Sequence, residues 1–403
     1  MAQDLPIQPT INMGIVGHVD HGKTTLTKLL SGKWTDTHSE EKKRGITIKL
    51  GYTNFTISKE KDSTYNVKNK GELLKRLSIV DAPGHESFMA TMISGAAVMD
   101  CALLLVAANE KCPQPQTIEH LKTLEISGIK NIIIVQNKID LVTKEEAFEN
   151  YKEIKNFLST TFAKDAPIMP MSAQHGANVS NLLKLIEEKF DDPKRDLKSN
   201  PRIHIVRSFD INKPGSSYTQ LKGGVIGGSL KQGELKVGEE IEIRPGLMKK
   251  VQGQISYTPI FAKVEGLMSD RDKLESVGPG GSIAIITKLD PILTKTDSLV
   301  GQIAGPVGTL AEPIESLKFS PELFEKIMAS TEEHVIKEIY KGEPLMMIVN
   351  SMTTVGIVSS ANAKEITVKL KKPVMAFEND KVVIFRRFDG NKWRIIGCGS
   401  VNE

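Results

Sequence analysis

The stretch that decides the fold is Ile11 to Thr24, which reads Ile-Asn-Met-Gly-Ile-Val-Gly-His-Val-Asp-His-Gly-Lys-Thr. The apolar run Ile11–Val16 predicts a buried strand, and residues 17–24 match the pattern G-x-x-x-x-G-K-[ST]. In that pattern, glycines let backbone N–H groups surround phosphates, and the helix that follows adds its positive end. Lys23 is then expected to reach the β- and γ-phosphates, and Thr24 to bind Mg²⁺ through its hydroxyl. The sequence therefore predicts a phosphate-binding loop of the P-loop type.

Two further motifs point to the third phosphate of a nucleotide. Asp81-Ala-Pro-Gly84-His85 follows the apolar run Leu77–Val80. An Asp at that strand end can hold Mg²⁺ through water, and the Gly84 N–H can meet the γ-phosphate. Thr47, in Arg-Gly-Ile-Thr-Ile at 44–48, is expected on Mg²⁺ only while the γ-phosphate is present. His85 is expected to orient the attacking water, although an exposed histidine can also be an ordinary surface residue.

The base-binding motif indicates guanine. Asn137-Lys138-Ile-Asp140 ends the apolar run Ile132–Gln136, and Ser172-Ala-Gln follows the next expected strand as the companion loop. A carboxylate at Asp140 can accept two N–H groups of guanine, whereas adenine offers an acceptor where a donor is needed. Each charge-assisted hydrogen bond contributes about 1.5–3 kcal/mol, so adenine is rejected. The four motifs, in this order, predict a GTP-binding domain and exclude a generic P-loop ATPase.

The pattern of apolar runs changes after the charged stretch Asp191–Asn200. Before it, short apolar runs alternate with amphipathic segments, which predicts a mostly parallel sheet covered by helices. After it, short alternating strands separated by glycines predict antiparallel barrels. A second break falls near Gly305–Gly308. We therefore expect an α/β P-loop GTPase domain at 1–200, followed by two all-β barrel domains at 201–306 and 307–403.

Composition excludes several classes of protein. No apolar run approaches the roughly 18–20 residues that span a membrane, and the N-terminus lacks a secretory pattern. The three cysteines, Cys101, Cys112 and Cys398, argue against a disulfide framework and favour the cytoplasm. The net charge of +4 is mild. It permits an RNA partner without establishing one, and we expect neither a membrane nor a DNA partner.

The motifs resemble those of the translational GTPases. The matching stretches are Gly-His-Val-Asp-His-Gly-Lys-Thr-Thr at 17–25, Glu-Lys-Lys-Arg-Gly-Ile-Thr-Ile at 41–48 and Asp-Ala-Pro-Gly-His at 81–85. Within that group, the chain resembles the γ subunits of archaeal and eukaryotic translation initiation factor two over almost its whole length. The stretches that carry this resemblance are Arg207-Ser-Phe-Asp-Ile-Asn-Lys-Pro-Gly, Leu221-Lys-Gly-Gly-Val-Ile-Gly-Gly-Ser and Leu289-Asp-Pro-Ile-Leu-Thr-Lys.

The resemblance implies a GTPase with a G domain and two β-barrels, in a heterotrimer with α and β subunits. It further implies delivery of initiator methionyl-tRNA to the small ribosomal subunit in the GTP state. The residues that it implies for GTP or GDP are Asp20, His21, Gly22, Lys23, Thr24, Thr25, Gly84, Asn137, Lys138, Asp140, Ser172, Ala173 and Gln174. Those that it implies for Mg²⁺ are Thr24 and Thr47, with Asp81 in the outer shell, and Asp20 and Gly45 for a further ion.

Two other functions stay open at this point. An elongation-type factor that carries aminoacyl- or selenocysteinyl-tRNA would share the P-loop and the switch motifs. A nucleotide-dependent scaffold would bind GTP mainly to hold partner subunits and would hydrolyse it very slowly.

The sequence departs from the family in one respect. The family usually has two Cys-x-x-Cys pairs between the first switch and the Asp-x-x-Gly motif, which form a zinc knuckle. The corresponding insert, Thr53–Lys75, contains neither Cys nor His. Because structural zinc needs about four such ligands, we expect no zinc here. The insert must then order itself by other means or remain mobile.

Overall fold

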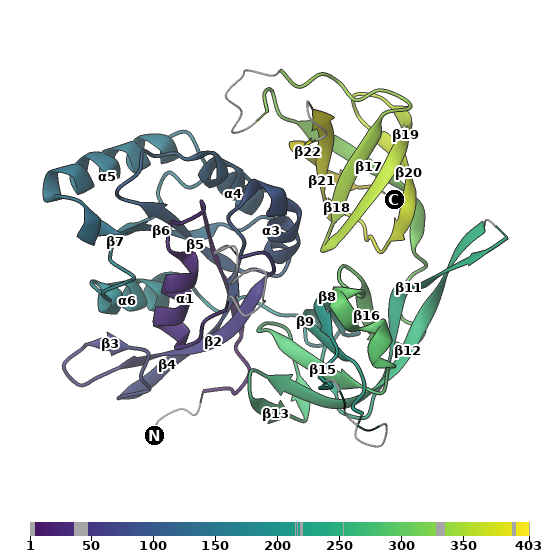
Figure 1. Cartoon of the computed structure of the whole chain (residues 1–403), viewed down its shortest axis with the longest axis horizontal. Helices are drawn as coiled ribbons and strands as arrows, with labels where there is room; N and C mark the ends of the chain where they lie inside the picture. Colours follow the sequence, from purple (N-terminus) through teal and green to yellow (C-terminus); the bar gives the residue numbers. More distant parts are fainter. Residues whose placement is uncertain are drawn as a thin grey trace. The chain divides into compact units, whose positions relative to one another are not determined.

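The structure is a computed structural model of the chain, and its element order is drawn in Figure 1. It describes residues 5–35, 47–213, 215, 217, 221–252, 254–327, 335–388 and 392–402. The chain divides into two compact units. The first comprises Met1–Lys194 with Gly280–Ser282, and the second Arg195–Pro279 with Ile283–Glu403.

The first unit contains a mixed sheet with the strand order β3-β2-β4-β1-β5-β6-β7. Its strands are β1 (Ile11–Gly17), β2 (Gly51–Lys59), β3 (Tyr65–Asn66), β4 (Glu72–Asp81), β5 (Cys101–Ala107), β6 (Asn131–Asn137) and β7 (Ile168–Pro170). From β4 to β7, neighbours pair in parallel, whereas β2 pairs antiparallel with β3 and β4. β1 and β5 are buried throughout, as their short apolar runs predict for strands covered on both faces.

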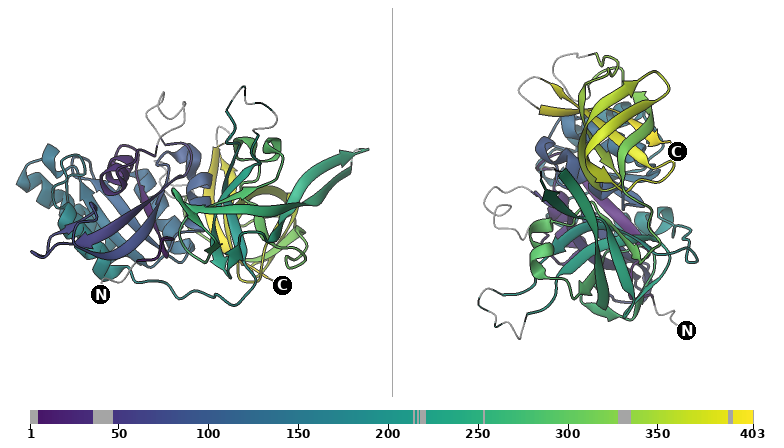
Figure 2. Two further views of the ribbon diagram at one scale, coloured as in Figure 1. Left: turned by 90° about the horizontal axis from the view of Figure 1, so that it is seen from below. Right: turned by 90° about the vertical axis from the view of Figure 1, so that its right-hand side faces the viewer.

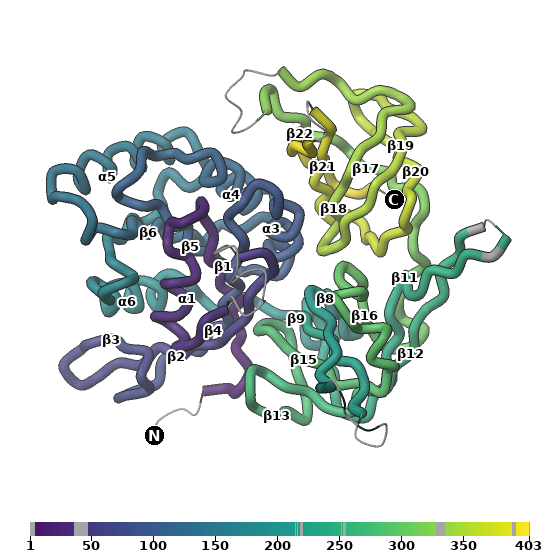
Figure 3. The backbone as a smooth tube through the Cα atoms, in the orientation of Figure 1, coloured from purple at the N-terminus to yellow at the C-terminus, as the bar shows by residue number. Residues whose placement is uncertain are grey.

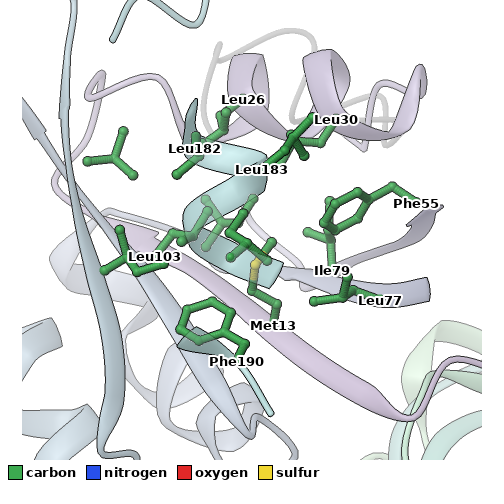
Figure 4. Packing of buried hydrophobic residues seen from close by; sticks show 14 of the residues in the cluster. Met13, Leu26, Leu30, Phe55, Leu77, Ile79, Leu103, Leu182, Leu183 and Phe190 are labelled. Carbon is green, nitrogen blue, oxygen red and sulfur yellow. The ribbon is translucent and has the colours of Figure 1, made fainter. Parts of the chain in front are cut away.

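Helices connect and cover these strands. They are α1 (Lys23–Ser31), α3 (Met89–Ala96), α4 (Pro115–Ile126), α5 (Lys144–Leu158) and α6 (Val179–Lys189), with short 3₁₀ turns η1 (Glu86–Phe88) and η2 (Ile139–Leu141). Figure 4 shows Leu26 and Leu30 of α1 and Leu182 of α6 packed over Met13 of β1 and Phe55 of β2. This core fixes α1 against β1, so the loop between them has a defined position.

The insert 53–75 is ordered as the outer part of the β2–β4 hairpin, with β3 at its edge (Figure 3). Asn66 is its hydrogen-bonding centre. Its Oδ1 accepts from Ser58 Oγ at 2.9 Å and from the Lys68 N–H at 2.9 Å, and its Nδ2 donates to Glu60 Oε1 at 3.1 Å. The Tyr65 N–H donates to Ser180 Oγ of α6 at 2.9 Å, which ties the hairpin to the helix. The absence of zinc stays a prediction of the sequence.

The second unit begins with a closed ring of strands. Its elements are β8 (Arg202–Phe209), β9 (Val225–Gln232), β10 (Leu235–Lys236), β11 (Glu240–Val251), β12 (Gln254–Ser269), β13 (Asp272–Leu274), β14 (Ser276–Val277), β15 (Ile283–Thr287) and β16 (Ile303–Pro306). The order β11-β16-β8-β9-β15-β12 closes because β11 also pairs with β12. Buried isoleucines and leucines of alternating strand positions fill the ring, including Ile203, Ile241 and Ile285.

The last barrel has the closed order β17-β20-β19-β18-β21-β22. Its strands are β17 (Ile314–Leu323), β18 (Pro344–Val349), β19 (Met352–Ala361), β20 (Ile366–Val374), β21 (Lys381–Phe388) and β22 (Lys392–Val401). Figure 2 shows the strands of both rings, in green and yellow. An α/β domain followed by two all-β barrels is thus confirmed. In the part of the chain that the structure describes, no helix is long and apolar enough to cross a membrane.

Candidate nucleotide-binding site

A cavity of about 280 Å³ lies where the first unit's sequence motifs converge. It is bounded by the loop after β1, the start of α1, residues between α1 and β2, and the segments that follow β4 and β6. The residues that line it are Val19, Asp20, Gly22, Lys23, Thr24, Thr25, Trp34, Thr47, Gly84, His85 and Lys138. Most of the residues predicted for phosphate and Mg²⁺ are therefore brought together, although Gly45 lies outside the described residues.

The loop between β1 and α1 has a backbone that few residues can adopt. Asp20 has φ 60° and Gly22 has φ 90°, both in the left-handed region. A Cβ at Gly22 would lie 2.3 Å from Asn137 Nδ2, so a side chain there would collide with the neighbouring loop. The first N–H groups of α1 have no partners within the helix. The residues that carry them, Lys23 to Thr25, line the cavity. Backbone donors and the helix dipole together suit this cavity to anions.

The Lys23 ammonium lies directly beside Gly84 of the Asp-x-x-Gly segment. It donates to the His18 carbonyl at 2.5 Å, and a Cβ at Gly84 would lie 2.3 Å from the same nitrogen. Glycine is thus the residue that lets the backbone at 84 approach the lysine. A phosphate group bound beside them would meet the Lys23 cation and the Gly84 backbone N–H from neighbouring directions.

The two threonines predicted for Mg²⁺ are adjacent. Thr24 Oγ1 and Thr47 Oγ1 lie 3.2 Å apart. Mg²⁺ with octahedral bonds of 2.0–2.1 Å places neighbouring ligands about 2.9 Å apart, so both hydroxyls fit one ion. Asp81, at the end of β4, is fully buried, and Asp20 lines the same cavity. The donor set is all oxygen, as Mg²⁺ prefers.

Thr35 and Trp34 belong to this site but were missed in the sequence. The Thr35 hydroxyl donates to Asp81 Oδ2 at 2.6 Å, which fixes the carboxylate. Trp34 lines the cavity, with Lys28 Nζ 5.3 Å from its ring centre. Both follow α1 directly, and no motif marks them. Only their position between the P-loop helix and the first switch could have indicated them.

Asn137 connects the P-loop to the loop at residues 172–174, which is predicted to contact the base and is called the base-side loop below. Its Nδ2 donates to the His21 carbonyl at 2.9 Å, and its Oδ1 accepts from the Ala173 N–H at 2.9 Å. The side chain is 2% exposed and does not line the cavity. It therefore holds two loops in register. Ser172 is also buried, with its Oγ accepting from the His175 N–H at 3.3 Å, whereas Gln174 is exposed.

Lys138 and Asp140 lie in the segment that follows β6, and of the two only Lys138 lines the cavity. Lys138 has φ 63°, and Asp140 lies in η2 with a partly exposed carboxylate. His175 Nε2 is 3.6 Å from Asp140 Oδ2, a neighbour that the motifs did not indicate. The carboxylate thus remains accessible to a ligand's N–H groups beside an exposed imidazole.

His85 sits at the rim of the cavity as the N-cap of η1. Its Nδ1 accepts from the Ser87 N–H at 3.2 Å. With Nδ1 used as the acceptor, a neutral imidazole carries its proton on Nε2. Nε2–H is then a donor, which can hold the oxygen of a water or a phosphate.

Buried histidines support the P-loop from beneath. His120 of α4 is fully buried and accepts the Gly17 N–H through Nδ1 at 2.9 Å. His21 Nδ1 donates to the Leu105 carbonyl at 2.9 Å, and its Nε2 is 3.4 Å from Glu110. Burial lowers the pKa of His120 well below its usual value and lowers the pKa of His21 to about 4. Both rings are therefore neutral near pH 7.

These histidines should make the first unit sensitive to acid. In the unfolded chain they bind protons near pH 6.5, whereas the folded chain keeps them neutral to lower pH. The contribution of these two histidines to the free energy of unfolding is thus fully present above pH 6.5. It falls as the pH drops from there towards the pKa of the folded state, by about 1.4 kcal/mol per pH unit for each group. His120→Gln, which retains an acceptor for Gly17, should flatten this dependence in urea unfolding at pH 7.0 to 5.0. His175→Gln, at an exposed side chain, is the matched control. Equal slopes in both variants would contradict the assignment.

Comparison with known proteins agrees with this geometry. The model of the elongation factor Tu GTP binding domain matches residues 8–192, and the model of the initiation factor eIF2 gamma C-terminal region matches residues 315–401. The first match implies GTP or GDP as the ligand, with Mg²⁺ in general terms.

Relatives named translation initiation factor 2 subunit gamma match the chain from end to end. The protein from Methanothermobacter thermautotrophicus is 51% identical, over 98% of this chain and 99% of its own length. The one from Methanococcus vannielii is 52% identical, with 98% of both chains covered, and the one from Pyrococcus horikoshii is 48% identical, again with 98% of both covered.

Solved structures of elongation factors share the fold at lower identity. A bacterial selenocysteine-specific elongation factor has a TM-score of 0.75 and 26% identity, over 98% of this chain and 58% of that one. SelB from Methanococcus maripaludis, bound to the GTP analogue GppNHp, has a TM-score of 0.74 and 23% identity, over 99% and 80%. An elongation-type function is not favoured, because these proteins are more distant than the initiation factors. The chain therefore belongs to the translation initiation factor 2 subunit gamma family, and it is a translational GTPase of the initiation-factor type.

Proposed function

We propose that this chain is the GTP-dependent switch subunit of a cytoplasmic heterotrimer with α and β subunits, which delivers initiator methionyl-tRNA to the small ribosomal subunit. The observation that carries the proposal is identity of about one half to proteins named as a subunit of translation initiation factor 2, over 98% of this chain. The match of the C-terminal region to the eIF2 gamma model, as well as of the G domain to a GTPase model, supports it.

The proposal assigns roles to the residues of the site. GTP would be bound by Asp20, His21, Gly22, Lys23, Thr24, Thr25, Gly84, Asn137, Lys138, Asp140, Ser172, Ala173 and Gln174. Mg²⁺ would be held by Thr24 and Thr47, with Asp81 in the outer shell, and a further ion by Asp20 and Gly45. When bound, the ion offsets phosphate charge. His21 and Asn137 would act through the backbone and loop contacts described above.

Hydrolysis follows from placement of donors around the third phosphate. Lys23 and the N–H groups of the P-loop would stabilise negative charge there, since they line the cavity. His85 would hold the attacking water through Nε2–H. Thr47 beside Thr24 would register the presence of the γ-phosphate, because its hydroxyl is shared with the metal site.

The proposed function predicts selective binding of one tRNA. The full chain, purified from its native source under mild conditions, should bring down two further subunits. The GTP-bound complex should bind methionylated initiator tRNA at least tenfold more tightly than elongator methionyl-tRNA, and the GDP-bound complex should lose that preference. Equal affinity for both tRNAs in the GTP state would instead support an elongation-type carrier.

Asp140 should determine guanine specificity. Asp140→Asn replaces the carboxylate acceptor with an amide, so GTP should weaken at least tenfold, given about 1.5–3 kcal/mol for each charge-assisted bond. Xanthosine triphosphate should bind better than GTP to this variant. His175→Ala removes the neighbouring imidazole but leaves the carboxylate, and should change GTP affinity by less than about threefold. Fluorescent-nucleotide titration measures the affinity of the parent protein and of both variants for GTP, and that of Asp140→Asn for xanthosine triphosphate. Unchanged GTP binding in Asp140→Asn would refute the role of Asp140 in recognising guanine.

Thr35 should act as a positioning residue for the metal site. Thr35→Val removes the hydroxyl that fixes Asp81 while keeping the side-chain shape. The Mg²⁺ concentration that half-saturates nucleotide binding should rise roughly tenfold, since hydrogen bonds to charged groups are worth about 1.5–3 kcal/mol. Thr53→Val in β2 is the control, because the Thr53 hydroxyl is buried without a hydrogen bond to any described residue. If this Mg²⁺ concentration changes equally little in both variants, Thr35 does not position Asp81 for the metal site.

His85 separates a switch from a scaffold. His85→Ala should slow single-turnover GTP hydrolysis by about 10²-fold or more, with nucleotide affinity little changed. His85→Gln keeps an N–H donor and should retain more activity than the alanine variant. The assay needs the ribosomal subunit and any activating component present. If His85→Ala hydrolyses GTP at the parent rate, His85 does not position the water.

A further inference from the structure

The second unit contains a polar cavity of about 430 Å³ that none of the motifs uses. It lies where residues 198–201 enter the first barrel, next to Thr309 and Leu310 after β16 and to Phe377 between β20 and β21. Lys198, Arg202 and Phe377 are the side chains on which the argument rests. Two of them are cationic, and among the described residues that line the cavity none is acidic.

Arg202 is the unusual residue of this cavity. Its guanidinium lies 3.7 Å from the ring centre of Phe377 and is half-buried, and burial lowers its pKa. No described residue accepts a hydrogen bond from it or forms an ion pair with it. The charge of Asp380 acts to raise the pKa of Arg202. Asp380 Oδ2 accepts from Asn350 Nδ2 at 2.6 Å and from the Phe377 N–H at 2.9 Å.

Other partly buried arginines of this unit have acceptors. Arg386 donates to both carboxylate oxygens of Glu343 and to the Lys337 carbonyl at 2.7 Å. Arg207 Nε donates to Asp297 Oδ1 at 3.0 Å. A guanidinium carries five N–H donors. None of those on Arg202 is among the fully buried donors that lack a partner in the described part of the chain, so they are open to solvent at the cavity. The guanidinium of Arg202, held over the Phe377 ring, therefore has donors available to an acceptor from outside the chain.

The wall of the cavity that carries Lys198 is held in place. Asp196 Oδ1 accepts from the N–H groups of Lys198 at 2.9 Å and Ser199 at 3.1 Å, and its carbonyl accepts from the Gly233 N–H at 2.7 Å. Gln232 Nε2 donates to the Asn200 carbonyl at 3.1 Å. These bonds fix the segment against the end of β9, so the cavity is formed before any ligand binds.

We propose that this cavity is a phosphate-binding site, separate from the P-loop, which takes a phosphate monoester or diester through Arg202 and Lys198. A planar guanidinium stacked on an aromatic ring presents two parallel N–H donors that match phosphate oxygens. The two positive charges suit a phosphate better than a single carboxylate. The volume is large enough for a nucleotide, and the phosphate can come from a free nucleotide or from an RNA backbone.

The test uses the full chain saturated with GDP and Mg²⁺, so that the P-loop is filled. One probe is adenosine monophosphate, and the other is a short single-stranded oligoribonucleotide without terminal phosphates. Arg202→Gln should weaken binding of the ligand at least tenfold at low salt, and Lys198→Gln roughly threefold. Arg387→Gln is the matched control, because Arg387 is an exposed arginine 5.1 Å from the ring centre of Trp393. It removes the same charge outside the cavity and should change binding less than twofold.

The two probes distinguish the sources of the phosphate. If the cavity variants lose only adenosine monophosphate binding, the ligand is a free nucleotide. If they lose only RNA binding, the ligand is a backbone phosphate, and if they lose both, the cavity is a general phosphate site. Thermal unfolding shows whether Arg202→Gln is folded. If it is not, Lys198→Gln decides, because its exposed side chain can be changed without disturbing the barrel. If the cavity variants and Arg387→Gln bind both probes alike, the proposal is overturned.

Discussion

The nucleotide site depends on the side chain of Asn137, which makes two hydrogen bonds, one as a donor and one as an acceptor. One holds the P-loop at His21, and the other holds the base-side loop at Ala173. Both bonds are buried, so losing either would leave a desolvated backbone group, at a cost of about 1–3 kcal/mol. The spacing between phosphate contacts and base contacts is therefore set by one amide, and Gly22 must be a glycine because that amide lies so close to it.

A second constraint on the P-loop comes from two buried histidines that pack beneath it, where apolar side chains would otherwise be expected. His120 and His21 satisfy the Gly17 N–H and the Leu105 carbonyl at a point where the loop leaves the regular β1 ladder. Leucine in their place would pack but would leave these backbone groups unpaired. Burial holds the rings neutral, so they add no positive charge to the affinity for phosphate. The rigidity of the loop and its acid sensitivity thus have the same origin.

The parts of the site that the sequence predicts are those that short stretches of chain build alone. Gly22, Lys23 and Gly84 lie in local patterns whose backbone geometry follows from glycine positions, and the structure brings them to one cavity. Thr35 and His175 become neighbours of Asp81 and Asp140 only after the strands pair, so no spacing reveals them. The alternation of strands and helices likewise predicts the fold class, whereas the domain limits at 200 and 306 and the roles of the site residues remain predictions.

The insert 53–75 is held by hydrogen bonds and by strand pairing among its described residues. Asn66 makes at least three hydrogen bonds inside the hairpin, and Tyr65 anchors it to α6. Such bonds contribute about 0.5–1.5 kcal/mol each, whereas a structural zinc site contributes about 10–16 kcal/mol. The hairpin therefore depends on its pairing with the central sheet through β4, and its stability is coupled to that of the strand that ends at Asp81. Because the hydrogen bonds of Asn66 form only when the hairpin is closed, the tip is expected to open whenever β2 and β4 separate.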